Sequence, residues 1–265
     1  MMIAANRYLL FLCLSLGCFF AKGQTARIRS LEQNVYQAGD EEGRLPAILA
    51  LCDEYKSLQR DTLDKYAYIA YGLGRTSRDP RLRMRSALAL AYDYQRWGWL
   101  DSVIVTVDPV IAAGPGPDRA VYFKASRLKA MAYAGHSRFQ EGLTLLYKLI
   151  GEAEAYGDSL TLAENYNSIA SIALARGQSK DAFTWLARAL SSDTHSTAFD
   201  PIRGAIYVNL AEAYYKRNTD SALFYIDKGI ALFRSVENYS NLGLALQRKS
   251  NILIDAQSSR GQKPR

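Results

Sequence analysis

Small and large apolar residues recur along this chain at helical spacing, and the same arrangement returns in successive units. The two clearest units each place a large residue, an apolar–small pair and one further residue on a predicted helix, then a small and a large apolar residue on the next helix. They comprise Tyr166, Ile169, Ala170, Ala173, Ala182, Leu186 and Ala189 in one unit, and Tyr207, Leu210, Ala211, Tyr214, Ala222, Ile226 and Gly229 in the other. Small residues at a helix crossing let two backbones approach closely, while large residues fill the gaps on either side. The pattern therefore predicts helices that pack in pairs.

The units follow one another with a nearly constant period. Weaker copies lie upstream, and the equivalent second-helix positions Val103, Gly142, Ala182 and Ala222 are 39, 40 and 40 residues apart. A fixed period of this length is typical of a repeat protein whose units stack on their neighbours. We therefore expect an all-α fold with many small contacts between helices rather than one central core.

Turn and capping residues place the helix ends between these repeats. Asp79-Pro80 and Asp200-Pro201 each put a capping Asp before a Pro that suits the first helical turn. Residues 103–107 alternate like a strand, but the repeat register predicts a helix there. The predicted helix pairs span residues 44–76, 79–112, 118–156, 158–192 and 200–235, with an N-terminal helix at about 25–38 and a lone helix at about 238–257.

These motifs resemble the tetratricopeptide repeat (TPR) family over roughly residues 80–256, and the string Asp220-Ser221-Ala222-Leu223-Phe224-Tyr225 is especially similar to the family's second helix. The period exceeds the family's standard of about 34 residues, which implies longer helices or connections. The resemblance implies a right-handed superhelix, an α-solenoid of about five hairpins plus terminal helices. The TPR-like domain would span 24–257 and a disordered tail 258–265. Exported arrays with long repeats of this kind resemble the sensory regions of bacterial signalling proteins.

The resemblance also implies where a ligand would bind. In a TPR superhelix the first helix of each pair lines a concave face, where related arrays hold extended peptides through polar side chains. Asn amides can both donate to and accept from a peptide backbone, and Arg can hold a carboxylate with two hydrogen bonds. Projecting the repeat register predicts the peptide-binding residues Glu164, Asn167, Ser171, Asn209, Glu212, Gln247, Arg248 and Asn251. The alternative, that these residues are simply solvated helix faces, stays open for each of them.

The first 23 residues are organised like a signal peptide. Arg7 gives a positive start, and residues 8–20 are almost wholly apolar. The small residues within 21–23 predict cleavage before Gln24. Cys18 offers a second interpretation, lipid attachment, and an uncleaved membrane anchor is a third. Nothing after residue 23 approaches eighteen consecutive apolar residues, so we expect no stable membrane span after removal of the signal.

Composition narrows the candidate chemistry. The net charge of +7 falls to about +5 once Arg7 and Lys22 leave with the signal, and no dense basic run is interleaved with aromatic residues. Nucleic acid is therefore not an expected partner. Outside the signal Cys52 is the single cysteine, which excludes an intramolecular disulfide, and His136 and His195 lie beside predicted turns. Without paired carboxylates, a nucleophile set, a phosphate loop or metal-ligand spacing, the chain is predicted to be non-enzymatic, with no cofactor or metal.

Together these features predict a scaffold in the bacterial cell envelope, periplasmic or surface-exposed, that binds a protein or peptide partner. One alternative is a sensory input module, possibly a truncated receptor, that biases a signalling partner when it binds a small ligand or an envelope peptide. A second alternative is an envelope hydrolase or lyase. The unpaired last helix fits either a cap or a truncated array. The sequence leaves the partner and the oligomeric state open.

Overall fold

The computed structural model describes residues 26–55 and 60–261. Within these ranges the chain is helical between short turns, and no strand occurs there. The prediction of an all-α fold is confirmed, and residues 103–107 lie inside a helix, α5 (Leu100–Ala112). The predicted signal peptide, the cleavage site before Gln24 and the end of the predicted tail fall outside the described residues.

Five consecutive helix pairs and a last helix make up the described chain after residue 40. Their bounds are α2 (Glu41–Tyr55) and α3 (Arg60–Thr76), α4 (Pro80–Trp97) and α5, α6 (Arg119–Gly135) and α7 (Phe139–Tyr156), α8 (Ser159–Ala175) and α9 (Ser179–Ser191), α10 (Asp200–Tyr214) and α11 (Thr219–Ser235), and α12 (Tyr239–Gly261). A helix over residues 26–37 precedes them. The predicted pairs match these bounds within a few residues, although α12 continues four residues beyond its predicted end at 257.

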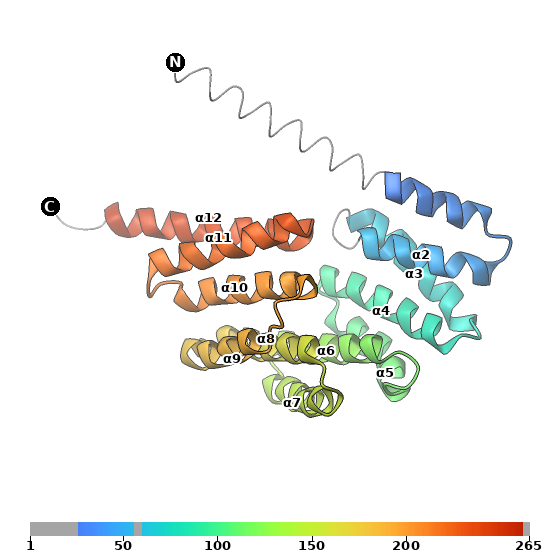
Figure 1. Cartoon of the computed structure of the whole chain (residues 1–265), viewed down its shortest axis with the longest axis horizontal. Coiled ribbons are helices and arrows are strands. Elements are labelled where there is room, and N and C mark those ends of the chain that lie inside the picture. Colours follow the sequence, from blue (N-terminus) through green and yellow to red (C-terminus); the bar gives the residue numbers. More distant parts are fainter. Residues whose placement is uncertain (1–25, 56–59, 262–265) are drawn as a thin grey trace, which may run out of the picture.

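The helices are arranged in an arc (Figure 1). Consecutive helices pack against each other in chain order, and the first helices α2, α4, α6, α8 and α10 also contact one another in that order. We call α2, α3 and α4 the N-terminal arm and α10, α11 and α12 the C-terminal arm. The two arms face each other across the middle of Figure 1, joined by α5 to α9. Helices far apart in the sequence are thereby brought around a common centre.

The contact between the two helices of a pair, which we call the seam, is built from the residues that set the sequence period. Val103, Gly142, Ala182 and Ala222 are each the fourth residue of their helix, and all four are buried. A methyl group added at Gly142 would lie 2.7 Å from the carbonyl oxygen of Ala130 in α6, too close for any real contact. Backbone proximity at the seam therefore explains why small residues recur with the period.

Most helix ends follow the predicted chemistry, with one correction. The carboxylate of Asp79 accepts a hydrogen bond from the Arg81 backbone N–H at 2.7 Å, and Pro80 is the first residue of α4. Asp200 was expected to cap α10 in the same way, but this is wrong. A 3-10 turn, η1 (Thr197–Phe199), leads directly into the helix, so that Asp200 already has helical dihedral angles. Its carboxylate instead forms an ion pair with Arg203.

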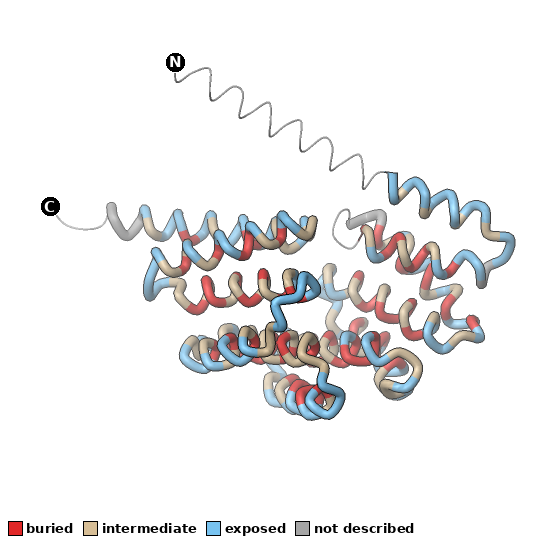
Figure 2. Tube along the Cα trace, viewed as in Figure 1, coloured by how far each residue is buried: buried red, intermediate tan, exposed pale blue. Residues whose placement is uncertain are grey.

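The core is distributed along the arc rather than gathered at one centre. Four clusters of buried apolar residues follow each other along the chain, from Leu45–Leu90 in the N-terminal arm to Val208–Ile252 in the C-terminal arm. Figure 2 shows the buried residues along the sides on which neighbouring helices touch, with exposed residues on the outward sides. Each pair is thus stabilised mainly by its neighbours, which leaves the inner side of the arc available for other groups.

A polar cavity as the candidate functional site

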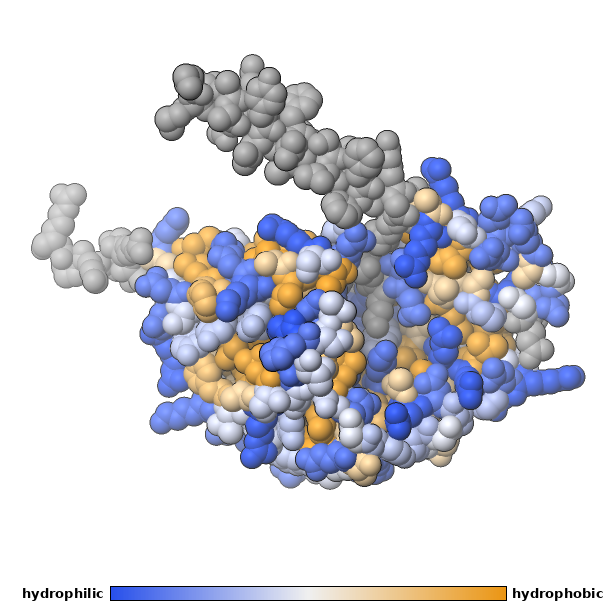
Figure 3. Space-filling view, viewed as in Figure 1, coloured by the Kyte–Doolittle hydropathy of each residue, from blue (hydrophilic) through white to orange (hydrophobic). Residues whose placement is uncertain are grey.

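The inner side of the arc holds a cavity of about 580 Å³. Its walls come from α2, α4, α6, α8 and α10, together with the α11–α12 turn and the first turn of α12. Both arms therefore contribute to one site. Hydrophobic side chains (orange) lie over both arms in Figure 3, with hydrophilic ones (blue) interspersed. The volume is within the usual range of about 300–1,000 Å³ for ligand sites.

The lining positions move along the first helices from one pair to the next. Tyr92 lies in the last two turns of α4, Arg127 at the middle of α6 and Asn167 at the middle of α8. Ile202 lies in the first turn of α10. The cavity is therefore lined by a late part of α4, by the middle of α6 and of α8, and by the beginning of α10.

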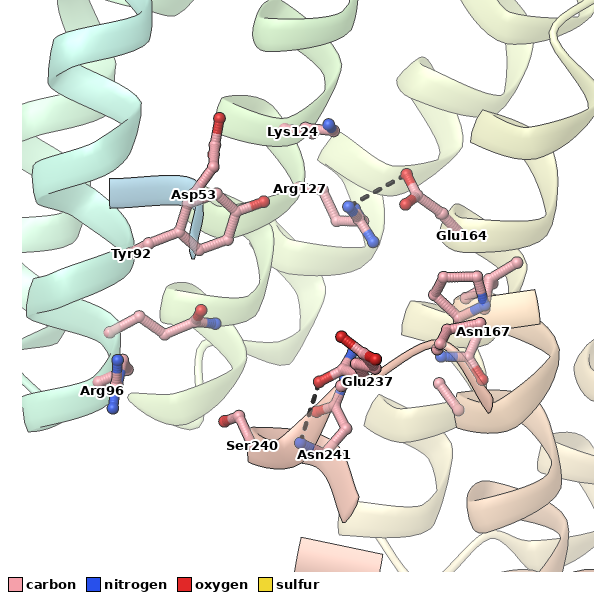
Figure 4. Close-up of a pocket in the computed structure, with 16 residues that line it drawn as sticks. Asp53, Tyr92, Arg96, Lys124, Arg127, Glu164, Asn167, Glu237, Ser240 and Asn241 are labelled. Carbon is pink, nitrogen blue, oxygen red and sulfur yellow. Dashed lines mark hydrogen bonds and ion pairs between the residues drawn. The ribbon is translucent and has the colours of Figure 1, made fainter. Parts of the chain in front are cut away.

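Charged side chains of both signs surround the cavity (Figure 4). The lining residues include three cations and three carboxylates, which are Arg96, Lys124, Arg127, Asp53, Glu164 and Glu237. Arg127 and Glu164 form an ion pair with an N–O distance of 3.0 Å, and each side chain is about one-fifth exposed. The site is consequently polar without a dominant charge.

A tyrosine stands at the wall formed by the N-terminal arm. Burial raises the pKa of Tyr92, and the carboxylates of Glu164 and Asp53 raise it as well, whereas the cations of Arg127 and Lys124 lower it. The net direction is upward, so the phenol is neutral at physiological pH and keeps its proton. A neutral phenol can both donate and accept a hydrogen bond.

A smaller cavity of about 230 Å³ adjoins the first and shares Asp53, Tyr92 and Lys124 with it. Its lining is more apolar than that of the main cavity. The buried residues Leu49, Leu88 and Val121 contribute to its wall. We call it the apolar annex. The cavity and its annex are thus neighbours that share lining residues from α2, α4 and α6.

The structure brings half of the residues predicted for peptide binding together. Glu164 and Asn167 line the cavity. The side-chain amide of Asn209 donates to Asn167 Oδ1 and to Ser171 Oγ, both at 2.9 Å. Ser171 and Asn209 thus stand behind Asn167 and fix its orientation.

The other predicted residues lie apart from the cavity lining. Glu212 and Arg248 form an exposed ion pair between α10 and α12, with an N–O distance of 3.1 Å. Gln247 and Asn251 are exposed on α12. The cavity meets α12 only through its first turn, at Ser240 and Asn241, because the last helix approaches the site with its end.

Lys124 and Arg127 were not among the residues predicted to bind a ligand, although the repeat period points to both. They lie forty residues before Glu164 and Asn167, which is the period of the seam. Applying that period to the predicted binding residues would have identified both. The period does not predict Tyr92, because a later turn of α4 lines the cavity.

The cysteine and the histidines considered as candidates in the sequence can be placed in the described chain, with the exception of the cysteines at 13 and 18. Cys52 is buried, and burial raises the pKa of its thiol to about 12, so a thiolate does not form at neutral pH. His136 Nε2 lies 3.1 Å from Asp101 Oδ1 at the surface. Within residues 26–55 and 60–261, no group of His, Cys, Asp or Glu side chains is placed to hold a metal ion. None of the described helices is long and apolar enough to cross a membrane.

Comparisons with known proteins add little to this picture. No family model and no curated protein matches the chain. A solved structure, BtubC (BKLC) from P. vanneervenii, aligns with 91% of this chain and 94% of its own at 16% identity, with a TM-score of 0.34. This similarity is too low to assign a fold or a function. The class that the structure itself defines is an all-helical protein of consecutive hairpins with a polar cavity on its inner side.

Proposed function

We propose that this chain is a TPR-type scaffold that binds an extended segment of a protein or peptide in the inner cavity and performs no chemistry of its own. In this proposal the hairpins form a right-handed superhelix, and the chain acts in the bacterial cell envelope. The observation that carries the proposal is a cavity whose lining comes from all the first helices from α2 to α10 and from the start of α12.

The lining suits a peptide backbone. An extended peptide presents N–H donors and C=O acceptors in alternation, so its site needs both kinds of partner. Asn167 and Asn241 supply amides that do both. Asn167 is held in place by Asn209, which reduces the entropy lost on binding.

Display selection with a random dodecapeptide library tests the proposal. The chain from Gln24 onward should enrich a defined pool of peptides. Ser240→Trp places a bulky side chain at the cavity wall and should reduce binding of that pool at least tenfold. Ser250→Trp, at an exposed position ten residues further along α12, is the matched control and should bind normally. The proposal is wrong if no pool is enriched over an unrelated helical protein, or if both variants bind equally.

The export part of the proposal has its own test. Expressed with residues 1–23 in a Gram-negative host, the mature chain should begin at Gln24 by intact mass. Lipid attachment would instead give a chain that begins at Cys18 with added acyl mass. A full-length chain that stays in the cytoplasm would contradict export.

A sensory role is the second candidate, because the cavity joins the two arms. Asp53 belongs to the N-terminal arm and Asn241 to the C-terminal arm, so a ligand that touches both would change the preferred opening of the arc. Spin labels at the exposed positions Lys65 and Ser250 would report this change as a shift in their distance distribution when a selected peptide is added. An unchanged distribution would favour a passive scaffold.

A further inference from the structure

Two charged side chains of the cavity remain available to a ligand. Arg127 is paired with Glu164, and Asp53 lies 3.7 Å from Arg85, a residue of the apolar annex. By contrast, the structure shows no ion pair between Lys124 or Glu237 and any other described residue. Lys124 comes from α6 and Glu237 from the α11–α12 turn. Lys124 and Glu237 thus place a cation and a carboxylate, each without an ion pair to another described residue, on different walls of the same cavity.

The two charges have different surroundings. Lys124 lines both the main cavity and the apolar annex. The other acidic residue of the annex, Asp118, uses its carboxylate to cap α6 by accepting from the Val121 backbone N–H at 3.1 Å. An anionic group that enters near Lys124 thus meets a cation beside an apolar pocket.

The opposite wall is polar and favours a cation. Glu237 is followed by Asn238, Ser240 and Asn241, which also line the cavity. The Asn238 side-chain oxygen is engaged in accepting from the Asn241 backbone N–H at 3.2 Å, so the carboxylate of Glu237 is the strongest acceptor in this turn. Figure 4 places Lys124 and Glu237 on separate sides of the space between the two arms.

We propose that the cavity selects a peptide segment with a defined direction. An acidic residue of the ligand binds Lys124, a neighbouring bulky apolar residue enters the apolar annex, and a basic residue toward the other end binds Glu237. This inference rests on the proposed function and adds the chemistry of the ligand to it. A segment with its charges exchanged would either place like charges together or, bound in the opposite direction, lose the contact of its apolar residue with the annex, so it should bind poorly.

The test is a display library in which the C-terminus of each random dodecapeptide is fused to the coat protein, so that no free C-terminal carboxylate is present. The wild-type chain should enrich peptides with Asp or Glu beside Leu, Ile, Met or Phe, and with Lys or Arg further along. Lys124→Glu and Glu237→Lys should each weaken the synthetic consensus peptide roughly tenfold, because each removes a charge-assisted contact and adds repulsion. The double variant should select the exchanged pattern, with a basic residue beside the apolar one.

Matched controls separate this effect from general changes in charge. Lys180→Glu on α9 and Glu154→Lys on α7 alter exposed residues outside the cavity and should leave the selected pattern unchanged. Lys124→Gln and Glu237→Gln serve as milder variants, and circular dichroism confirms the helical content of each protein.

The outcomes distinguish the two proposals. A wild-type pool without the acidic–apolar pairing, or a double variant that selects the wild-type pattern, overturns the directional inference and leaves the peptide-binding function standing. Failure of the wild-type chain to enrich any pool over an unrelated helical protein overturns both. Reversal of the pattern in the double variant supports both.

Discussion

Where the two helices of a pair meet, the side chains are small and almost completely buried, whereas the face that the first helices turn toward the cavity is polar and varies from pair to pair. Val103, Ala182 and Ala222 at the seam have no exposed surface. In contrast, the lining changes from Tyr92 in α4 to Arg127 in α6. The seam residues recur in the four pairs from α4–α5 to α10–α11 because the helices of each pair pack in the same way. The residues that line the cavity differ from pair to pair. Such variation is expected if one asymmetric ligand contacts all the pairs.

The largest effect that the comparison predicts is at the seam. Gly142→Ala should lower the free energy of unfolding by about 2–3 kcal/mol, because the new methyl group would lie 2.7 Å from a backbone oxygen of α6 and the helices would have to separate. Gly151→Ala in the same helix is the control. No atom lies within 4 Å of its added methyl group, so it should raise stability by about 0.5–1 kcal/mol through helix propensity.

Urea denaturation followed by circular dichroism measures both variants. Equal effects of the two substitutions would show that α6 and α7 do not depend on close approach at the seam. A loss of stability in Gly142→Ala alone would support that dependence.

A second prediction concerns the connection from α9 to α10, where the chain lacks a tight glycine turn. Arg203 binds Asp193 through two N–O contacts of 2.5 and 2.8 Å, and the Asp193 side chain is only 7% exposed. Asp193→Asn should therefore cost about 1–3 kcal/mol at neutral pH, as expected for hydrogen bonds to a buried charged partner.

The pH dependence of this contact has a definite sign. Hydrogen bonds from Arg203 lower the pKa of Asp193 in the folded chain. The stabilisation is therefore fully present above the unfolded pKa of about 3.9, and it is lost as the pH falls from there through the lower folded value. Wild type and Asp193→Asn should converge in stability over that range. A constant difference between them down to pH 2 would contradict the assignment. Glu141→Gln, which removes the exposed partner of Arg138, should leave the denaturation midpoint unchanged.

The same contrast explains what the sequence predicted. Gly142 and Ala182 were identified because a seam repeats one steric requirement at a fixed distance. Of the residues that the register predicts for peptide binding, Glu164 and Asn167 line the cavity, whereas Gln247 and Asn251 lie outside its lining. The register assumes that every first helix presents the same turn, whereas α4 lines the cavity with a late part of its length and α12 reaches it only with its first turn. A tertiary arrangement of this kind is not encoded in the local pattern of any one helix.

A third prediction tests whether the inner face contributes to stability through its ion pair. A double-mutant cycle with Arg127→Met and Glu164→Gln should give a coupling of about 0.5–1 kcal/mol, because both side chains are partly exposed and screened by water. Sodium chloride at 1 M should reduce the coupling. A coupling of several kcal/mol, comparable with the effect at the seam, would show that the pair holds α6 and α8 together rather than shaping a binding surface.

The smallest expected effect is at Lys124, a cavity cation that forms no ion pair with another described residue. Lys124→Ala should change the free energy of unfolding by less than about 0.5 kcal/mol, as is usual for an exposed side chain, and Ala also favours the helix slightly. The same substitution should weaken a selected acidic–apolar peptide, so stability and binding would separate at one residue. Urea denaturation and fluorescence anisotropy of the labelled peptide measure the two quantities on the same protein. A loss of more than about 1 kcal/mol in the free energy of unfolding would show that Lys124 stabilises the fold. Its role would then not be limited to ligand binding.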